Sequence, residues 1–93
     1  MTTRADRIHR AIAARFAPAE VTVRDDSAQH AGHAGAAPGG ETHYSLTVVS
    51  PAFAGLSRVA RSRAVHEALA GEFASGLHAL ALTLRTPEEA AGR

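Results

Sequence analysis

Apolar residues recur at helical spacing near the start of the chain. They fall three or four residues apart and therefore share one face of a helix over residues 4–16. These positions are Ala5, Ile8, Ile12 and Phe16. Thr3 can cap the start of this helix, and Pro18 prevents its continuation. The pattern predicts an N-terminal helix that packs on the core through its apolar face.

Three later stretches alternate between apolar and polar residues, as half-buried strands do. They cover residues 20–25, 42–50 and 78–85. A helix over 57–74 is predicted before the last strand, with Ser57 as its N-cap and Gly76 just beyond its end. Its apolar stripe consists of Leu56, Val59, Val65, Leu69 and Phe73. A helical turn over 50–55 and a last one from Thr86 complete the predicted elements.

This order of elements predicts an α+β fold in which a three-stranded sheet carries its helices on one face. The predicted core consists of Ile8, Ile12, Phe16, Val21, Val23, Leu46, Val48, Leu69, Phe73, Leu80 and Leu82. A length of 93 residues fits one domain over residues 1–93. The tail, residues 90–93, is expected to fray.

Residues 28–40, between the first two strands, hold four of the eight glycines and no large apolar side chain. Such a segment cannot bury apolar surface, so we expect a flexible hairpin loop. It is longer than the usual hairpin connection. That length is typical of an insertion under little constraint or of a functional loop.

Composition excludes several classes of function but does not identify one. The chain has no cysteine, which excludes disulfides, a thiol nucleophile and thiolate metal ligands of its own. Arginine supplies all ten basic residues against nine acidic ones, so a net charge of +1 indicates no general attraction to nucleic acid or membranes. The charged start and the short apolar runs predict a cytoplasmic chain without a targeting or membrane-spanning segment.

Histidines carry the candidate metal chemistry. His30 and His33 lie in the glycine-rich loop at H-x₂-H spacing, and His78 opens the third strand. Neutral imidazole binds transition metals, so these three side chains could supply nitrogen ligands. The alternative is a polar surface loop whose histidines bind nothing.

The other three histidines are expected to be structural. They are His9, His43 and His66. His43 stands at a strand start, where its ring can hold a turn by hydrogen bonds. His66 is expected to be partly buried on its helix.

Arginines gather at the start of the 57–74 helix. They are Arg58, Arg61 and Arg63, of which Arg58 and Arg61 are three residues apart and share a face. Together with the first helix's Arg4, Arg7 and Arg10, they could contact phosphates. The alternative is an ordinary solvated face. At a net charge of +1, we expect any DNA binding to be weak and strongly dependent on salt.

Enzyme motifs are missing from the sequence. No serine lies in a nucleophile elbow, and a chain without lysine cannot form a phosphate-binding P-loop. Asp25 and Asp26 are adjacent on a strand, where neighbouring side chains point to opposite faces. The sequence therefore predicts a protein that is not an enzyme.

Taken in order, short segments spread over residues 5–89 resemble the BolA family. They are Val21-x-Val-x-Asp25-Asp-Ser27, Glu41-Thr-His43-Tyr, Val48-Val-Ser50-x-x-Phe53-x-Gly55, Arg61-x-Arg63-x-Val65, Leu69-x-x-Glu72-Phe and Gly76-x-His78-Ala-Leu80-Ala, followed by Thr86-Pro87. The resemblance implies a class II KH-like fold with the order α-β-β-α-α-β(-α) and a three-stranded mixed sheet. That order agrees with the elements predicted above.

The resemblance also implies two functions. One is partnership with a monothiol glutaredoxin, in which glutaredoxin and glutathione give thiolates to a shared [2Fe-2S] cluster and the BolA protein gives imidazole. The chain would then be a monomer when alone and hold a cluster only in the complex. The other function is transcriptional regulation by direct DNA binding.

For the cluster role, the family's main ligand falls on His78. Its second ligand, a histidine or cysteine of the hairpin loop, falls on His30 when counted from Asp25 and on His33 when counted back from His43. A histidine common in the family is replaced here by Ser62, and the G-x-x-G of KH domains is missing after Gly55. The first departure removes any ligand or nucleic-acid role of that histidine, and the second weakens the expected KH-type binding of RNA.

Overall fold

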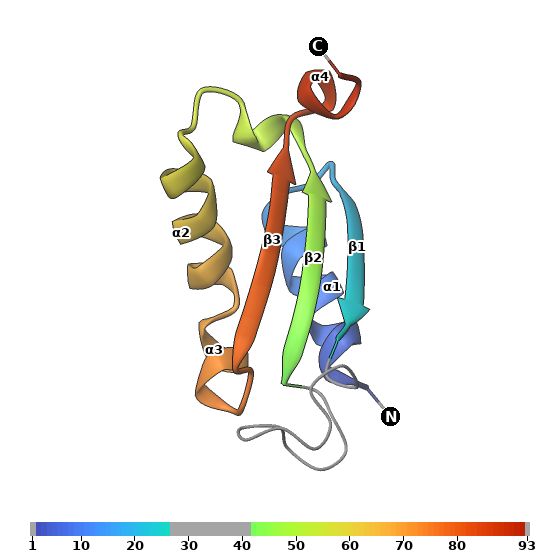
Figure 1. Cartoon of the computed structure of the whole chain (residues 1–93), viewed down its shortest axis with the longest axis vertical. Helices are drawn as coiled ribbons and strands as arrows, with labels where there is room; N and C mark the ends of the chain where they lie inside the picture. Colours follow the sequence, from blue (N-terminus) through green and yellow to red (C-terminus); the bar gives the residue numbers. More distant parts are fainter. Residues whose placement is uncertain (1, 27–41, 93) are drawn as a thin grey trace.

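The structure, a computed structural model, describes residues 2–26 and 42–92. Its elements are α1 (Arg4–Arg15), β1 (Glu20–Asp25), β2 (His43–Val49), the 3₁₀ turn η2 (Pro51–Phe53), α2 (Arg58–Ala68), α3 (Ala70–Ala74), β3 (Ala79–Arg85) and α4 (Pro87–Ala90). The α+β fold and the three predicted strands are confirmed (Figure 1). The predicted loop over 28–40 lies outside the described residues.

The sheet has the order β1-β2-β3 and is mixed. β1 pairs antiparallel with β2, so that Val23 lies opposite Leu46. β2 pairs parallel with β3, because the chain crosses from one to the other through α2 and α3 (Figure 1). As a consequence, the strand starts at His43 and Ala79 lie side by side at one end of the sheet.

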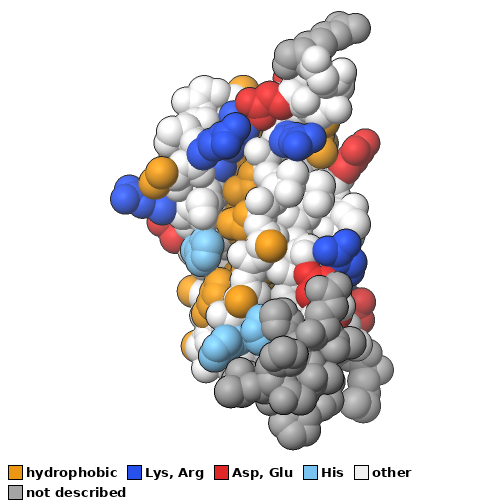
Figure 2. All heavy atoms as spheres, viewed as in Figure 1, with side chains coloured by type: hydrophobic (Ala, Val, Ile, Leu, Met, Phe, Trp, Pro, Cys, Tyr) orange, Lys and Arg blue, Asp and Glu red, His pale blue; other side chains and the backbone are white. Residues whose placement is uncertain are grey.

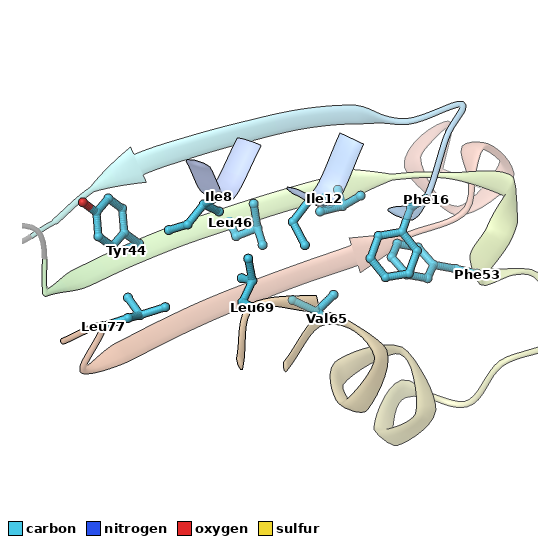
Figure 3. Packing of buried hydrophobic residues seen from close by; sticks show 10 residues of the cluster. Ile8, Ile12, Phe16, Tyr44, Leu46, Phe53, Val65, Leu69 and Leu77 are labelled. Carbon is cyan, nitrogen blue, oxygen red and sulfur yellow. The ribbon is translucent and has the colours of Figure 1, made fainter. Parts of the chain in front are cut away.

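The core lies between one face of the sheet and the helices α1 and α2 (Figure 3). Its fully buried side chains are Ile8, Ile12, Phe16, Tyr44, Leu46, Val48, Phe53, Val65, Leu69 and Leu77. Five of the predicted core residues are only partly buried around this cluster: Val21, Val23, Phe73, Leu80 and Leu82. The opposite face carries exposed side chains such as Thr22, Thr47 and Thr83, as predicted for a sheet covered on one side.

The predicted helix over 57–74 is wrong in two respects. It is divided at Leu69, whose N–H donates to both Val65 O at 3.1 Å and His66 O at 3.2 Å in a tightened last turn of α2. Val59 was placed in its apolar stripe but is 59% exposed. The inward face instead follows Arg61, Val65 and Leu69 at four-residue spacing, and Val59 lies two positions from that row, on the opposite side of the helix.

Side-chain caps fix the junctions between these elements. Thr3 and Asp6 form a reciprocal capping box at the start of α1. The buried Ser50 hydroxyl donates to Phe16 O at 2.7 Å and accepts from Ala52 N, which joins the end of α1 to the turn after β2. Within residues 2–26 and 42–92, no helix is both long and apolar enough to cross a bilayer.

Candidate functional site

The backbone holds His78 at the entrance to β3. Gly76, with φ at +127°, reverses the chain after α3, and Leu77 N then donates to Glu72 O at 2.8 Å. The N–H groups of His78 and Ala79 both donate to Thr42 O, at 2.8 and 3.1 Å. The imidazole itself is exposed. His78 therefore combines a fixed backbone with an accessible ring.

His43 lies beside His78, and sequence reasoning missed this contact. The two ring centroids are 5.5 Å apart, with their planes tilted by 42°. The pairing follows from the parallel register, which sets His43 opposite Ala79. Thr42 Oγ1 is 2.8 Å from His43 Nδ1 and helps to orient the ring. The expected hydrogen bonding of His43 is therefore present, but the same side chain also belongs to a pair of imidazoles.

His30 and His33, the two loop candidates, lie outside the described residues. Within residues 2–26 and 42–92, no group of three or more histidine, aspartate or glutamate side chains could hold a metal ion. The histidine pair lies at the end of the sheet where β2 and β3 begin, and histidine side chains are pale blue in Figure 2. On its own, this pair can supply two nitrogen donors to a metal held mainly by other groups.

His66 does not have the burial predicted for it. Its side chain is exposed on α2 and stacks on Phe73, with ring centroids 5.2 Å apart. Its Nδ1–H donates to Ser62 O at 2.8 Å. The sequence pattern could not show this, because Phe73 lies on α3 beyond the break in the helix.

The structure does not bring the predicted arginine cluster to one exposed face. Arg58 and Arg63 are exposed, whereas Arg61 is 8% exposed and points inward. Arg61 Nε donates to Leu56 O at 3.0 Å, and Nη1 donates to Leu84 O at 3.2 Å and to Glu89 Oε1 at 2.6 Å. The hydrogen bond from Arg61, together with one from Thr86 N–H, lowers the pKa of Glu89 to about 2 from its ordinary 4.5. Arg61 thus joins α2 to β3 and α4.

Two arginines of the first helix are likewise engaged within the fold. Arg4 Nη1 and Arg7 Nε each form an ion pair with the Glu72 carboxylate, at 2.9 and 3.0 Å. Hydrogen bonding from Arg7, together with the charges of both arginines, lowers the pKa of Glu72. Arg4, Arg7 and Arg10 were the candidates for phosphate contacts on this helix. Of these three, Arg10 alone is exposed and forms no ion pair with a described residue.

Comparison with known proteins gives a consistent assignment. The family model described as BolA-like protein matches residues 12–89. The chain is 44% identical over 91 residues to SufE-like protein 1, chloroplastic/mitochondrial, of Arabidopsis thaliana, covering 94% of this chain and 24% of that protein. It is 42% identical over 90 residues to the UV-induced protein uvi31 of Schizosaccharomyces pombe, covering 92% of this chain and 88% of that one.

A solved structure agrees in shape as well as in sequence. The BolA domain of SufE1 from Arabidopsis thaliana matches with a TM-score of 0.84 and 43% identity, over 96% of this chain and 98% of that domain. The chain thus corresponds to about a quarter of the full SufE-like protein 1 and to nearly all of its BolA domain. With the family model covering most of the sequence, the chain belongs to the BolA-like protein family.

Proposed function

We propose that this BolA-like chain is a partner of a monothiol glutaredoxin and supplies imidazole ligands to a [2Fe-2S] cluster shared between the two proteins. The observation that carries the proposal is the juxtaposition of His78 and His43, with ring centroids 5.5 Å apart at one end of the sheet. The parallel pairing of β2 and β3 fixes the backbone of His43, and the bond from His78 N–H to Thr42 O fixes that of His78.

The donor set fits a shared cluster better than a site that this chain completes alone. The sequence contains no cysteine, so every thiolate must come from the partner and glutathione. The pair of imidazoles can fill the remaining positions on one iron, as two histidines do in Rieske centres. A cluster in this site would supply electron-transfer capacity or iron and sulfide for delivery, and histidine ligation raises its potential.

The residues have distinct roles in this proposal. His78 is the main ligand because its ring is exposed and its backbone is held by Thr42. His43 is the second, oriented through Nδ1 by the Thr42 hydroxyl. His30 and His33, which the family resemblance favours for the second position, are its competitors. Because imidazole binds metal only when neutral, acid should release the complex.

Visible circular dichroism of the mixed complex tests these roles. Equimolar chain is added to cluster-loaded monothiol glutaredoxin with glutathione, and the spectrum is compared for wild type and alanine variants. We expect His78→Ala to abolish the spectral change and His43→Ala to reduce it strongly, with the fold retained because neither ring lies in the core. His9→Ala is the matched control, since His9 is an exposed histidine on α1.

The same series assigns the second ligand. If His30→Ala or His33→Ala removes the signal while His43→Ala does not, the second ligand lies on the loop. A wild-type spectrum from His78→Ala would contradict the proposal itself.

DNA binding, the alternative from sequence, has less support. Three of its six arginines, Arg4, Arg7 and Arg61, form ion pairs with glutamates inside the fold. The surface left for phosphate contacts consists of Arg10, Arg58 and Arg63. We therefore place the glutaredoxin partnership first.

A further inference from the structure

A cavity of about 900 Å³ lies between the start of α2 and the last half of β3. The lining residues that matter here are Arg58, Arg61, Leu82, Leu84, Arg85 and Glu89. His78 precedes the opposite end of β3, so the cavity is separate from the histidine pair. Figure 2 shows arginine side chains over this end of the molecule and apolar side chains between α2 and β3.

The cavity has an excess of positive charge. Arg61 and Glu89 neutralise one another through their ion pair of 2.6 Å. Arg58 and Arg85 are both exposed, and within the described residues neither guanidinium group takes part in an ion pair or hydrogen bond. Two cations without a counter-charge at one cavity favour an anionic occupant.

The wall of the cavity is an edge strand whose backbone faces it. β3 pairs with β2 on one side only. Arg85 O accepts from Ser50 N on the β2 side, whereas Leu84 O points outward and accepts from Arg61 Nη1. Since backbone groups of alternate residues in a strand point the same way, Leu82 N–H and C=O also point outward. Such an edge is a template for another strand.

We propose that this cavity binds an extended acidic peptide from a partner protein. The peptide pairs with the β3 edge at Leu82 and places carboxylates at Arg58 and Arg85. Edge amides supply backbone hydrogen bonds, and the two cations select for acidic side chains. A single-stranded nucleic acid fits less well, because it is usually held by stacking on aromatic rings, and the described lining includes no aromatic residue.

Fluorescence anisotropy with a labelled eight-residue peptide that alternates valine and glutamate tests the proposal. We expect Arg58→Gln and Arg85→Gln each to weaken binding about fivefold and the double variant about 25-fold, because each removes one charge-assisted contact. Arg63→Gln is the matched control, an exposed arginine on the same helix outside the cavity, and should change binding less than twofold. The same peptide with lysine for glutamate should not bind.

N-methylated peptides test the strand pairing. One peptide is methylated at every valine and the other at every glutamate, so each blocks the N–H groups along one of its edges. Exactly one of the two should lose binding at least tenfold, and amide shifts in ¹⁵N spectra should centre on Leu82 and Leu84.

Four outcomes would overturn the proposal. They are no binding of the parent peptide, equal binding of both methylated peptides, tighter binding of a twelve-nucleotide oligothymidine, and dimerisation of the chain through β3 in sedimentation. None of them alters the cluster proposal, which is read from the histidine variants.

Discussion

Arg61 shows how a charged side chain can be buried in a small protein and connect several of its elements. It lies on the inward row of α2 with its guanidinium 5.8 Å from the Phe53 ring and with hydrogen bonds to two backbone carbonyls and Glu89. A buried cation is tolerated when its hydrogen bonds are met in this way. Three elements that are separate in the sequence therefore meet at one side chain.

Removing Arg61 should destabilise the fold. Arg61→Ala leaves the carbonyls of Leu56 and Leu84 without this donor and opens a cavity beside Phe53. We expect a loss of about 2–3 kcal/mol in the free energy of unfolding, measured by urea denaturation. Arg63→Ala, on the exposed side of the same helix, should stay within about 0.5 kcal/mol of wild type. Equal effects of the two variants would show that Arg61 acts only as surface charge.

Arg61 and His43, two of the residues that sequence reasoning misjudged, share a physical cause. Arg61 was counted as polar and therefore as exposed, whereas its partners Leu84 and Glu89 lie far along the chain. His43 was judged on its local turn, whereas its neighbour His78 is set beside it by parallel pairing. Local patterns contain neither fact. The position of His78 itself was predictable, because it precedes an alternating strand.

At the scale of elements, Gly76 is the joint between α3 and β3. Its φ of +127° belongs to a region that side chains rarely adopt, and an added Cβ would lie 3.2 Å from Arg4 Nη2. Arg4 donates from Nη2 to Ser75 O at 3.1 Å and is ion-paired with Glu72. The conformation of one glycine thus sets both the entrance to β3 and the contact of α1 with α3.

A pair of glycine substitutions tests this joint. Gly76→Ala should cost about 1–3 kcal/mol of unfolding free energy, because alanine is strained at this φ. Gly71→Ala is the control: it lies within α3, no atom lies within 4 Å of the added Cβ, and alanine favours helix by about 1 kcal/mol. Thermal unfolding should therefore move in opposite directions for the two variants. A stable Gly76→Ala protein would refute the strain argument.

Elements that depend on a local sequence pattern could be predicted, whereas features that depend on tertiary packing could not. The strands were correct to within a residue or so, since alternation at Val21 and Val23 or at Leu80 and Leu82 directly reflects a half-buried sheet. The predicted end of the helix over 57–74 was not correct, because the division at Leu69 depends on burying Leu69 and Leu77 together against the sheet. The apolar stripe continued through the break and concealed it.

Over the whole molecule, two glutamates hold the helices to the rest of the fold. Glu72 joins α3 to Arg4 and Arg7 of α1, and Glu89 joins α4 to Arg61 of α2. Each carboxylate, when it is charged, accepts hydrogen bonds from arginine. These bonds lower the pKa of both glutamates in the folded protein. Both contacts are long-range in sequence, so acid weakens the tertiary structure rather than a single helix.

The sign of the acid dependence follows from these pKa values. Glu89 has a pKa of about 2 when folded and about 4.5 when unfolded, so the unfolded chain takes up its proton first as the pH falls. The contribution of Glu89 to stability is complete above pH 4.5 and is lost as the pH falls from there toward 2. Glu72 contributes with the same sign, because its pKa is also lowered on folding.

A double variant should remove much of this dependence. We expect Glu72→Gln/Glu89→Gln to have a lower Tm than wild type at pH 7 and to lose less of it on acidification, so that the two curves converge toward pH 2. The control is Glu67→Gln on α2, an exposed glutamate outside the ion pairs of the described residues, which should keep the wild-type slope. Tm measured by circular dichroism between pH 7 and pH 2 gives both curves. Parallel curves for wild type and double variant would show that these two carboxylates are not the groups through which acid unfolds the protein.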